Sequence, residues 1–499
     1  MALEFIKNMK LNYHKMNCVL IYRLSFFIGI LFFSNQEAIH AQIKKPNVIV
    51  FIADDFGYGS TNTYGASEDL IKTPNINTLA SEGVKFRNAY TTGSVCTPTR
   101  YALMTGQYSW RTRLKKGVVN MTDPALIDVK TKTLPKYMQS LGYKTAIVGK
   151  WHLGFKKEKF KNLLGEIYPS PIDYGLDYAF VLPNNLDDGH KVYIENNKIY
   201  GLRSNKISAY GKSFYGKQYT GYDAPQRITE NVTDDLTEKA INWMDSVSKD
   251  KPFFLYYAAA AVHHPIVPSA KMRGKSNAGA YGDFIQDIDR SLGDLISYLE
   301  AKGIRENTII IFASDNGGDI PNKKGWVMPE NFAVNKGLKI NGSHKGDKHT
   351  IWDGGFRIPF IINYPNKIKS NKIAETTVST IDIYAFLADY IGNNKGIEKE
   401  DMPDSFSFKN SVLKPTKFHN RAPLVHRDAR GRKAIRFGKW KYIESIKNKK
   451  NINAAMLFDI SKDPKETTNL ISSETKIADQ AKQYLNNVID NSSKRIWNK

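Results

Sequence analysis

The residues best suited to chemistry are Cys96 and the segment that follows it. They lie within residues 93–106 (GSVCTPTRYALMTG), where Pro98 suits the first turn of a helix and Thr97 can cap that turn. Arg100 lies one turn after Cys96 and can face the same point. Because helix N-termini favour anions, this segment predicts an anion site that contains a sulfur nucleophile. A small buried cysteine before an ordinary helix would give the same local pattern.

Four runs of consecutive apolar residues, in which apolar and polar residues do not alternate, lead directly into polar residues that could do chemistry. They are residues 47–52 (NVIVFI), 145–148 (TAIV), 253–261 (FFLYYAAAA) and 308–312 (TIIIF). Such runs predict strands that are buried on both faces. Helical patterns lie between them, at residues 73–82, 135–141, 234–248 and 281–301. This alternation predicts an α/β fold, a large doubly wound sheet flanked by helices.

Ligands of such sheets bind beyond the carboxyl ends of the strands. The four runs place acidic, amide, basic and imidazole side chains at that edge: Asp54, Asp55, Lys150, His152, His263, Asp315 and Asn316. The carboxylates and the amide offer only oxygen ligands, which suit Ca²⁺ or Mg²⁺ rather than Zn²⁺.

Positive and proton-transferring side chains complete this group. Lys150 and Lys348 add positive charge, and His152 and His263 can transfer protons near neutral pH. His264 is next to His263 and could take its place. Four other histidines have no comparable setting and are interpreted as surface or structural residues: His190, His344, His349 and His426.

The N-terminus is typical of a signal peptide, which we assign to residues 1–41. Lysines and Arg23 precede a short apolar run at residues 24–33 (LSFFIGILFF), and Ala41 follows a polar stretch. The run is short for a transmembrane helix, so we expect export, to the periplasm, the surface or the medium, without stable membrane insertion; an uncleaved anchor is the alternative. Cleavage would remove Cys18 and leave Cys96 as the one cysteine of an exported chain, which then has no internal disulfide.

The net charge indicates an acidic partner. The chain of 499 residues carries a formal charge of +23, and residues 1–41 hold four Lys/Arg and two Asp/Glu, so +21 remains after cleavage. A field of this sign favours nucleic acid, anionic membranes or acidic polysaccharides. Export makes nucleic acid the least suitable of these, and a generally basic surface with no such partner is the simpler interpretation.

The C-terminal part of the sequence has a different pattern of predicted elements. Residues 433–443 and 455–460 predict antiparallel strands, and residues 474–490 predict a terminal helix. We therefore expect a catalytic α/β domain at residues 42–413 and a small α+β domain, an antiparallel sheet plus a helix, at residues 414–499.

Several motifs together resemble type I, formylglycine-dependent sulfatases. Residues 96–100 (CTPTR) and 103–106 (LMTG) are similar to the family signature Cys-x-Pro-Ser/Ala-Arg followed by Leu-Thr-Gly, with Thr99 in place of Ser or Ala. Further segments resemble the family in the same order: 53–58 (ADDFGY), 149–154 (GKWHLG), 314–317 (SDNG), 348–359 (KHTIWDGGFRIP), 457–459 (LFD) and 463–470 (DPKETTNL). The likeness covers about residues 45–470.

The resemblance implies an alkaline phosphatase-like fold with a mixed sheet, and a modified Cys96. A formylglycine-generating or an anaerobic sulfatase-maturating enzyme would convert Cys96 to formylglycine, whose hydrate is the nucleophile. One Ca²⁺, or Mg²⁺, would be held by four oxygen-bearing side chains and residue 96: Asp54, Asp55, Asp315 and Asn316.

The same resemblance implies roles for the charged residues. One hydroxyl of the hydrate, next to the cation and Arg100, would attack sulfur. His263 would protonate the leaving oxygen while Lys348 neutralises its charge. His152 would take a proton from the second hydroxyl to expel sulfate, and Lys150 would bridge the hydrate and the sulfate.

The expected activity is hydrolysis of sulfate esters on a sulfated polysaccharide or oligosaccharide. Export and charge favour such a substrate. Composition favours a marine algal glycan such as ulvan, carrageenan or porphyran, and animal glycosaminoglycans stay open as the alternative. Asn184, Asn185 and Asp187 lie in the segment at residues 174–200 and are the predicted sugar contacts. Two alternatives stay open: a phosphate or phosphonate monoester hydrolase on the same fold, and a non-catalytic binder of acidic glycans.

Overall fold

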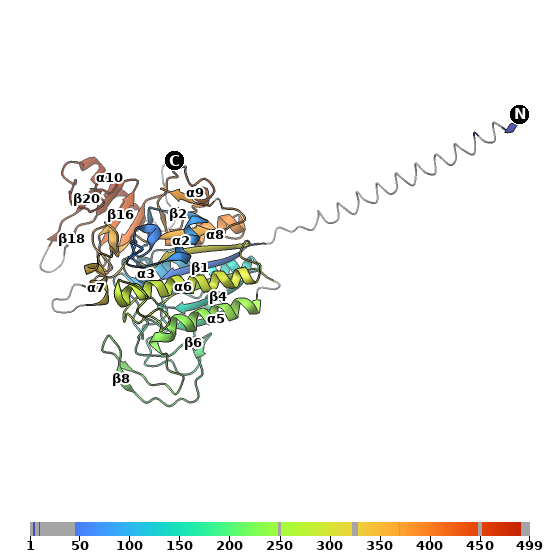
Figure 1. Ribbon diagram of the computed structural model, residues 1–499. Helices are drawn as coiled ribbons and strands as arrows, with labels where there is room; N and C mark the ends of the chain where they lie inside the picture. The colour runs from blue at the N-terminus through green and yellow to red at the C-terminus, as the bar shows by residue number, and fades with distance from the viewer. Residues whose placement is uncertain are drawn as a thin grey trace. The chain divides into compact units, whose positions relative to one another are not determined.

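Apolar strands form a mixed sheet in the computed structural model, with ten strands among the described residues (Figure 1). Their order is β13-β2-β12-β11-β1-β10-β4-β5-β6-β7. The bounds are β1 (Asn47–Ala53), β2 (Val84–Phe86), β4 (Lys144–Lys150), β5 (Tyr178–Leu182), β6 (Ile194–Glu195), β7 (Lys198–Ile199), β10 (Phe253–Ala258), β11 (Thr308–Ser314), β12 (Phe360–Asn363) and β13 (Lys372–Ala374).

The structure describes residues 45–490 apart from 248–250, 322–327, 369 and 448–451, together with Leu3, Glu4 and Met9. Met1–Lys45 and Pro46–Lys499 are two separate units. Apart from three residues, the predicted signal peptide at 1–41, with Cys18, lies outside the described part. Within the described part, no helix combines the length and the apolar character needed to cross a membrane.

The centre of the sheet is parallel. β11, β1, β10, β4 and β5 run in one direction, with Val48 paired to Phe254 on one side and to Ile309 on the other. β12 and β6 run antiparallel to their neighbours β11 and β5. All seven residues of β1 are buried, as a strand covered on both faces requires. The predicted doubly wound, mixed α/β sheet is confirmed.

Helices cover both faces of this sheet. Their bounds are α2 (Pro74–Ser81), α3 (Cys96–Thr105), α4 (Leu134–Ser140), α5 (Val232–Val247), α6 (Gly279–Ala301) and α8 (Ile383–Gly392). Because strand side chains alternate in direction, Val48 and Val50 pack in a core with α3, α4 and α8, whereas Ile49 and Phe51 pack with α2, α5 and α6. Figure 1 shows α5 and α6 side by side across one face.

A smaller antiparallel sheet follows near the C-terminus. It comprises β15 (Leu424–Arg427), β16 (Lys433–Phe437), β17 (Trp440–Ile443) and β20 (Met456–Asp459), and α10 (Thr475–Asp490) buries Ala481 and Leu485 in the same hydrophobic cluster. The predicted small sheet and helix are therefore present. A bridge between Gly93 and Arg427 links this part to the loop before α3.

Short elements make up the rest. They are η1 (Asn62–Tyr64), β3 (Ala89–Tyr90), η2 (Ser109–Arg111), η3 (Pro171–Tyr174), β8 (Tyr210–Lys212), β9 (Gln218–Tyr219), η4 (Thr229–Asn231), α7 (Pro329–Asn335), η5 (Asp353–Gly355), β14 (Val378–Ser379), η6 (Thr380–Asp382), η7 (Lys399–Asp401), α9 (Lys409–Leu413), β18 (Ile446–Lys447) and β19 (Ile452–Asn453).

Candidate active site

Three acidic side chains meet beyond the carboxyl ends of β1 and β11. Asp54 and Asp55 follow β1, and Asp315 follows β11, which pairs with β1 in register. One oxygen of each, together with Cys96 Sγ, lies in a cluster whose atoms are within 4.8 Å of one another. All four residues are buried. Carboxylates brought this close out of water need positive charge around them.

Three basic side chains supply that charge. Lys150 Nζ, from the end of β4, lies 2.6 Å from Asp54 Oδ2, and Lys348 Nζ lies 2.6 Å from Asp55 Oδ2. Arg100, from α3, contacts Asp315 Oδ2 through Nε at 3.0 Å and through a terminal nitrogen at 2.8 Å. Three carboxylates are thus balanced by three cations in the described part of the site.

The surrounding charges change the pKa values of two of these carboxyl groups. Burial alone would raise the pKa of Asp55, but Lys348 and His263 hold it well below its usual value. Burial and the nearby charge of Asp54 raise the pKa of Asp315 to about 6, although Arg100 opposes this. Burial together with the charge of Asp54 therefore outweighs the effect of the nearby cations on Asp315.

Asn316 adds a buried oxygen to the cluster. Its Nδ2 donates to Asp55 Oδ1 at 2.7 Å and to the Gly317 carbonyl at 2.8 Å. The amide orientation is set by these two acceptors, and Oδ1 is left buried without a hydrogen-bond partner. A buried acceptor of this kind calls for a ligand.

Cys96 is the first residue of α3, so its side chain lies at the N-terminus of that helix. Sγ is 3.5 Å from Asp54 Oδ1. Burial raises the pKa of the Cys96 thiol well above its usual value, and Asp315 and Asp54 add to this against Lys150. Burial among these carboxylates therefore outweighs the effect of the helix N-terminus, and the thiol stays protonated.

The predicted capping role of Thr97 is wrong. The residue before the helix is Val95, and no side chain caps the N-terminus. Thr97 Oγ1 instead donates to the His152 carbonyl at 3.0 Å and accepts from the Val119 N–H at 3.2 Å. Because Thr97 is already inside the helix, its hydroxyl joins the helix to two neighbouring loops.

His152 presents a free imidazole nitrogen. Its Nε2 lies 3.1 Å from the Val119 carbonyl, which can only accept, so we assign the proton to Nε2 and the lone pair to Nδ1. Nδ1 is buried without a partner. Burial, Lys150 and Arg100 lower the pKa of His152 well below its usual value, so the ring is neutral at pH 7 and can accept a proton.

His263 follows β10 and faces the same cluster. Nε2 lies 3.7 Å from Asp55 Oδ2, and Nδ1 lies 2.9 Å from the His264 carbonyl. Burial and Lys348 lower the pKa of His263 well below its usual value. His264 points elsewhere and contacts Asp319 and Glu330, so His263 is the histidine of this pair that faces the carboxylates.

Two glycines allow these loops to meet. Gly149 has φ of 122°, and a Cβ there would lie 1.8 Å from the Ala258 carbonyl oxygen of β10. A Cβ on Gly317 would lie 1.8 Å from the Gly354 carbonyl oxygen. Any side chain at either position would push apart the segments that carry Lys150, Asn316 and Lys348.

Two of the site residues also have an uncommon backbone conformation. Asp55 and His152 adopt φ of 58° and 56°, in the left-handed region that non-glycine residues seldom occupy. Such conformations persist where the surrounding contacts enforce them.

The chain matches the sulfatase family model over residues 46–393 and the model for N-sulphoglucosamine sulphohydrolase, C-terminal, over residues 342–493. The chain belongs to the sulfatase family. It is thus a hydrolase of sulfate esters in the alkaline phosphatase superfamily.

Individual sulfatases support this assignment. An N-acetylgalactosamine-6-O-sulfatase of Bacteroides thetaiotaomicron is 32% identical over 487 residues, covering 89% of this chain and 93% of that protein. The human N-acetylgalactosamine-6-sulfatase is 28% identical over 354 residues, covering 68% of this chain and 61% of that protein. A solved Bacteroides thetaiotaomicron structure, from work on the metabolism of multiple glycosaminoglycans, matches with a TM-score of 0.82 and 31% identity over 90% of this chain and 100% of that chain.

The oxygen cluster of this sulfatase fits a hard divalent cation. Asp54, Asp55 and Asp315 supply carboxylate oxygens, and Asn316, which donates to Asp55, has a buried Oδ1 without a partner. Ca²⁺ and Mg²⁺ prefer such ligands. The donor set does not distinguish these two ions.

The three predicted sugar contacts have different surroundings. Asn184 Nδ2 lies 3.4 Å from the Val119 carbonyl that also contacts His152, so Asn184 borders the site. Asn185 and Asn184 each have a buried side-chain oxygen without a partner. Asp187 is engaged within the protein, because its oxygens accept from Lys191, Tyr219 and the Phe214 N–H at 2.6 to 2.7 Å.

Sequence reasoning missed several contributors. The Val119 carbonyl sets the tautomer of His152, and Asp319 and Glu330 hold His264 away from the cluster. Asp319 could have been found from the sequence, because it lies in the loop directly after Asp315. Nothing in the sequence pointed to Tyr215, whose hydroxyl lies 3.2 Å from His263 Nδ1.

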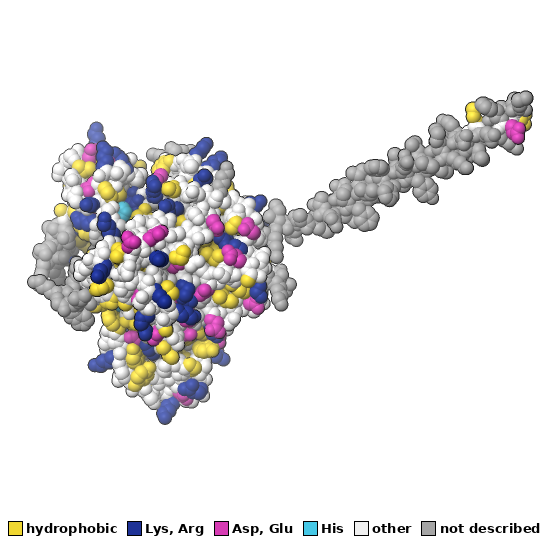
Figure 2. Space-filling model, in the orientation of Figure 1, with side chains coloured by type: hydrophobic (Ala, Val, Ile, Leu, Met, Phe, Trp, Pro, Cys, Tyr) yellow, Lys and Arg dark blue, Asp and Glu magenta, His cyan; other side chains and the backbone are white. Residues whose placement is uncertain are grey.

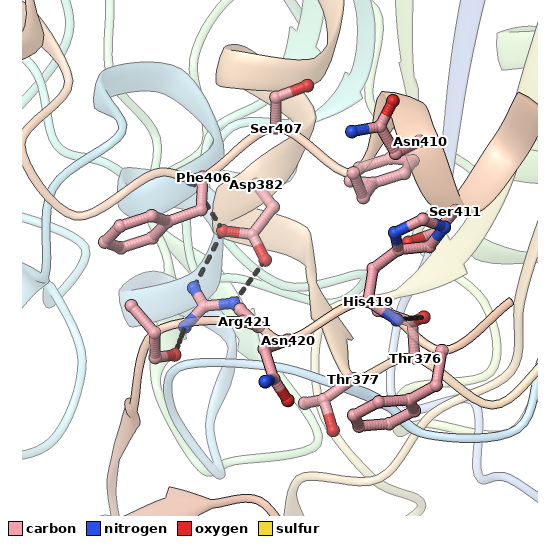
Figure 3. Close-up of a pocket in the computed structure, with 13 residues that line it drawn as sticks. Thr376, Thr377, Asp382, Phe406, Ser407, Asn410, Ser411, His419, Asn420 and Arg421 are labelled. Carbon is pink, nitrogen blue, oxygen red and sulfur yellow. Dashed lines mark hydrogen bonds and ion pairs between the residues drawn. The ribbon is translucent and has the colours of Figure 1, made fainter. Parts of the chain in front are cut away.

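A separate hollow of about 380 Å³ lies against η6 and α9 (Figure 3). Its residues include Asp382 and Arg421, whose two hydrogen bonds of 2.6 and 2.7 Å satisfy both charges within the protein. None of the predicted site residues lines this hollow.

Proposed function

We propose that this sulfatase removes 6-sulfate groups from N-acetylgalactosamine in an acidic oligosaccharide or polysaccharide. The observation that carries the proposal is the buried cluster around residue 96, in which Asn316 Oδ1 and His152 Nδ1 lack partners. The relative that is 32% identical across almost the whole chain is an N-acetylgalactosamine-6-O-sulfatase, and it supports this sugar. This substrate replaces the marine algal glycans that composition favoured.

Cys96 would be converted to formylglycine by a maturating enzyme. The buried, protonated thiol is a poor nucleophile, which supports a modified residue at the same position. When present, the aldehyde hydrate supplies a hydroxyl nucleophile at the N-terminus of α3.

Asp54, Asp55, Asp315 and Asn316 would hold one Ca²⁺ or Mg²⁺. The cation, when bound, supplies positive charge against the transferred sulfate group. Arg100 forms an ion pair with Asp315 and lies 3.5 Å from Asp54, so its role is to orient two of these ligands.

Three further side chains of the site transfer protons or offset charge. His152 Nδ1 accepts a proton from the nucleophile, since it is buried, neutral and unpartnered. Lys348 carries its charge at neutral pH, because Asp55 raises the pKa of its ammonium group well above the usual value against the effect of burial. Lys348 offsets the charge on the leaving oxygen, and His263 protonates that oxygen once a bound sulfate ester has favoured its charged form.

Export to the periplasm or beyond accompanies this function. The N-terminal charged and apolar pattern supports a signal peptide at residues 1–41, followed by the catalytic part at 42–413 and the small domain at 414–499. N-terminal sequencing of the protein recovered from the periplasm tests the cleavage site.

The function is tested by measuring sulfate release from a panel. The panel contains oligosaccharides that end in 6-sulfated or 4-sulfated N-acetylgalactosamine, carrageenan and ulvan oligosaccharides, 4-nitrophenyl sulfate and 4-nitrophenyl phosphate. We expect the 6-sulfated amino sugar to react fastest. Faster release of phosphate from the aryl phosphate would favour the phosphate hydrolase alternative, and no turnover of any ester would favour a binding protein.

Mass spectrometry of the peptide that contains residue 96 tests the modification. Active enzyme should carry an aldehyde at this position, with a mass lower than that of cysteine. Active enzyme with an unmodified thiol would refute this nucleophile. Cys96→Ala should fold normally and lose turnover.

A further inference from the structure

A short hairpin reaches the histidine side of the active site. It consists of β8 and β9, in which Tyr210 pairs with Tyr219. At its turn, Tyr215 places its hydroxyl 3.2 Å from His263 Nδ1 and 3.4 Å from the His264 carbonyl. Phe214 stacks on the His264 ring at 5.6 Å between centroids. The hairpin tip and the carboxylates therefore contact opposite nitrogens of His263.

The hairpin is anchored by a carboxylate from another loop. Asp187 accepts from the Phe214 N–H at 2.6 Å and from the Tyr219 hydroxyl at 2.7 Å, and Lys191 pairs with it at 2.7 Å. A two-stranded hairpin is barely stable alone, so these bonds fix where its aromatic tip lies. Asp187 thus positions the hairpin, a different task from the sugar contact predicted for it.

The tip stays open to solvent despite this anchoring. Phe214 and Tyr215 are 46% and 44% exposed, next to a His263 that is only 4% exposed. Lys212 and Lys217 flank the aromatic pair and are exposed. Dark blue basic side chains are visible in Figure 2 at the lower end of the molecule, where Figure 1 places β8. Exposed apolar groups held at an active site are typical of a ligand surface.

We propose that Phe214 and Tyr215, held by Asp187, form a substrate-binding surface on which a sugar ring of an acidic oligosaccharide stacks, with Lys212 and Lys217 facing the acidic groups of neighbouring sugars. Aromatic side chains provide flat apolar faces, and sugar rings present C–H faces that match them. The two lysines match the charge of the chain. The proposal rests on the proposed function, because it takes His263 as the residue on the leaving-group side.

The test compares a sulfated oligosaccharide with a sulfate ester that contains no sugar. The oligosaccharide ends in 6-sulfated N-acetylgalactosamine, and the aryl ester is 4-nitrophenyl sulfate. Phe214→Ala and Tyr215→Ala should lower kcat/KM for the oligosaccharide by about 10-fold or more relative to the aryl ester, the size of a lost pocket contact. Tyr215→Phe keeps the ring and should keep most of this preference. Lys217→Ala should cause a smaller loss that disappears at high salt.

Control variants separate binding from folding. Phe418→Ala removes another exposed aromatic side chain, which lines the separate hollow, and should leave the ratio unchanged. If Phe214→Ala unfolds at a lower temperature, Phe214→Leu keeps apolar bulk without an aromatic face and should still lose the preference. Equal losses on both substrates would overturn the proposal, since the hairpin would then only support His263.

Binding gives a readout that needs no turnover. In a Cys96→Ala background, calorimetry should show weaker binding of the acidic oligosaccharide when Phe214→Ala is added. If the wild-type enzyme releases no sulfate from the glycan but cleaves the aryl ester, the substrate assignment fails. If it cleaves the glycan and the hairpin variants keep the wild-type ratio and affinity, the hairpin proposal alone fails.

Discussion

The ammonium group of Lys348 lies 2.6 Å from Asp55 Oδ2, although 293 residues separate the two along the chain. Asp55 holds a left-handed backbone conformation, and Lys348 is 5% exposed. The contact therefore joins the first sheet strand of the catalytic part to a late loop inside the site. Lys348 thus offsets the charge of Asp55, in addition to the catalytic role proposed for it above.

Lys348→Ala should therefore reduce both activity and stability. Removing one partner of a buried pair leaves an uncompensated charge, which costs about 3 kcal/mol. Loss of the cation that faces the leaving oxygen should lower kcat by about 100-fold or more. Urea unfolding and steady-state kinetics measure the two effects, and Lys339→Ala, at an exposed lysine of the same region, should change neither. Wild-type kcat in Lys348→Ala would exclude the proposed role.

Asn316→Ala should weaken binding of the divalent cation. The variant removes the buried oxygen that lacks a partner and also the amide that orients Asp55. Calorimetric titration with Ca²⁺ and with Mg²⁺ should give an affinity lower by about 10-fold or more. Chelation should lower the melting temperature of the wild-type protein, because binding to the folded state alone stabilises it. Asn335→Ala, at the exposed end of α7, should bind the ion normally; equal affinities in both variants would remove Asn316 from the site.

The strand-end residues could be found from the sequence because buried parallel strands have a distinctive pattern. Four apolar runs pointed to the edge at which Asp54, Asp315 and Lys150 meet. The order of the strands was not accessible, since it depends on which runs pair across hundreds of residues. The strand pattern did not place Lys348 at this edge, because no strand ends at it.

Other features of the site could not be predicted from the sequence, because they depend on which residues come together in the folded protein. The spacing of Arg100 from Cys96 predicted that the two side chains face the same point, but it could not show that Arg100 pairs there with Asp315 and Asp54. Asp187 appeared available for a sugar, yet a hairpin some thirty residues later uses both its oxygens. The position of Cys96 at the N-terminus of a helix was readable from the sequence, whereas its burial among carboxylates, which raises the pKa of the thiol, was not.

His263→Ala should affect poor leaving groups more than good ones. A sugar oxygen needs a proton as the sulfur–oxygen bond breaks, whereas 4-nitrophenolate leaves without one. We expect kcat to fall by about 100-fold or more with the 6-sulfated sugar and by clearly less with 4-nitrophenyl sulfate. His264→Gln is the matched control, since its ring points to Asp319 and Glu330, and it should affect both esters equally. Equal losses in His263→Ala would move proton donation to another group.

His264 should make stability fall at alkaline pH. Burial alone would lower its pKa, but Asp319, 3.1 Å from Nε2, and Glu330, 2.8 Å from Nδ1, raise the pKa to about 9 from an ordinary 6.5. Because the folded state binds the proton more tightly, the stabilisation is complete below about pH 6.5 and is lost as the pH rises through about 9. Its full size is roughly 3 kcal/mol. Urea unfolding between about pH 6 and about pH 10 should show this loss in the wild-type protein and not in His264→Gln. Parallel curves for the two proteins would show that His264 is not charged in the folded state.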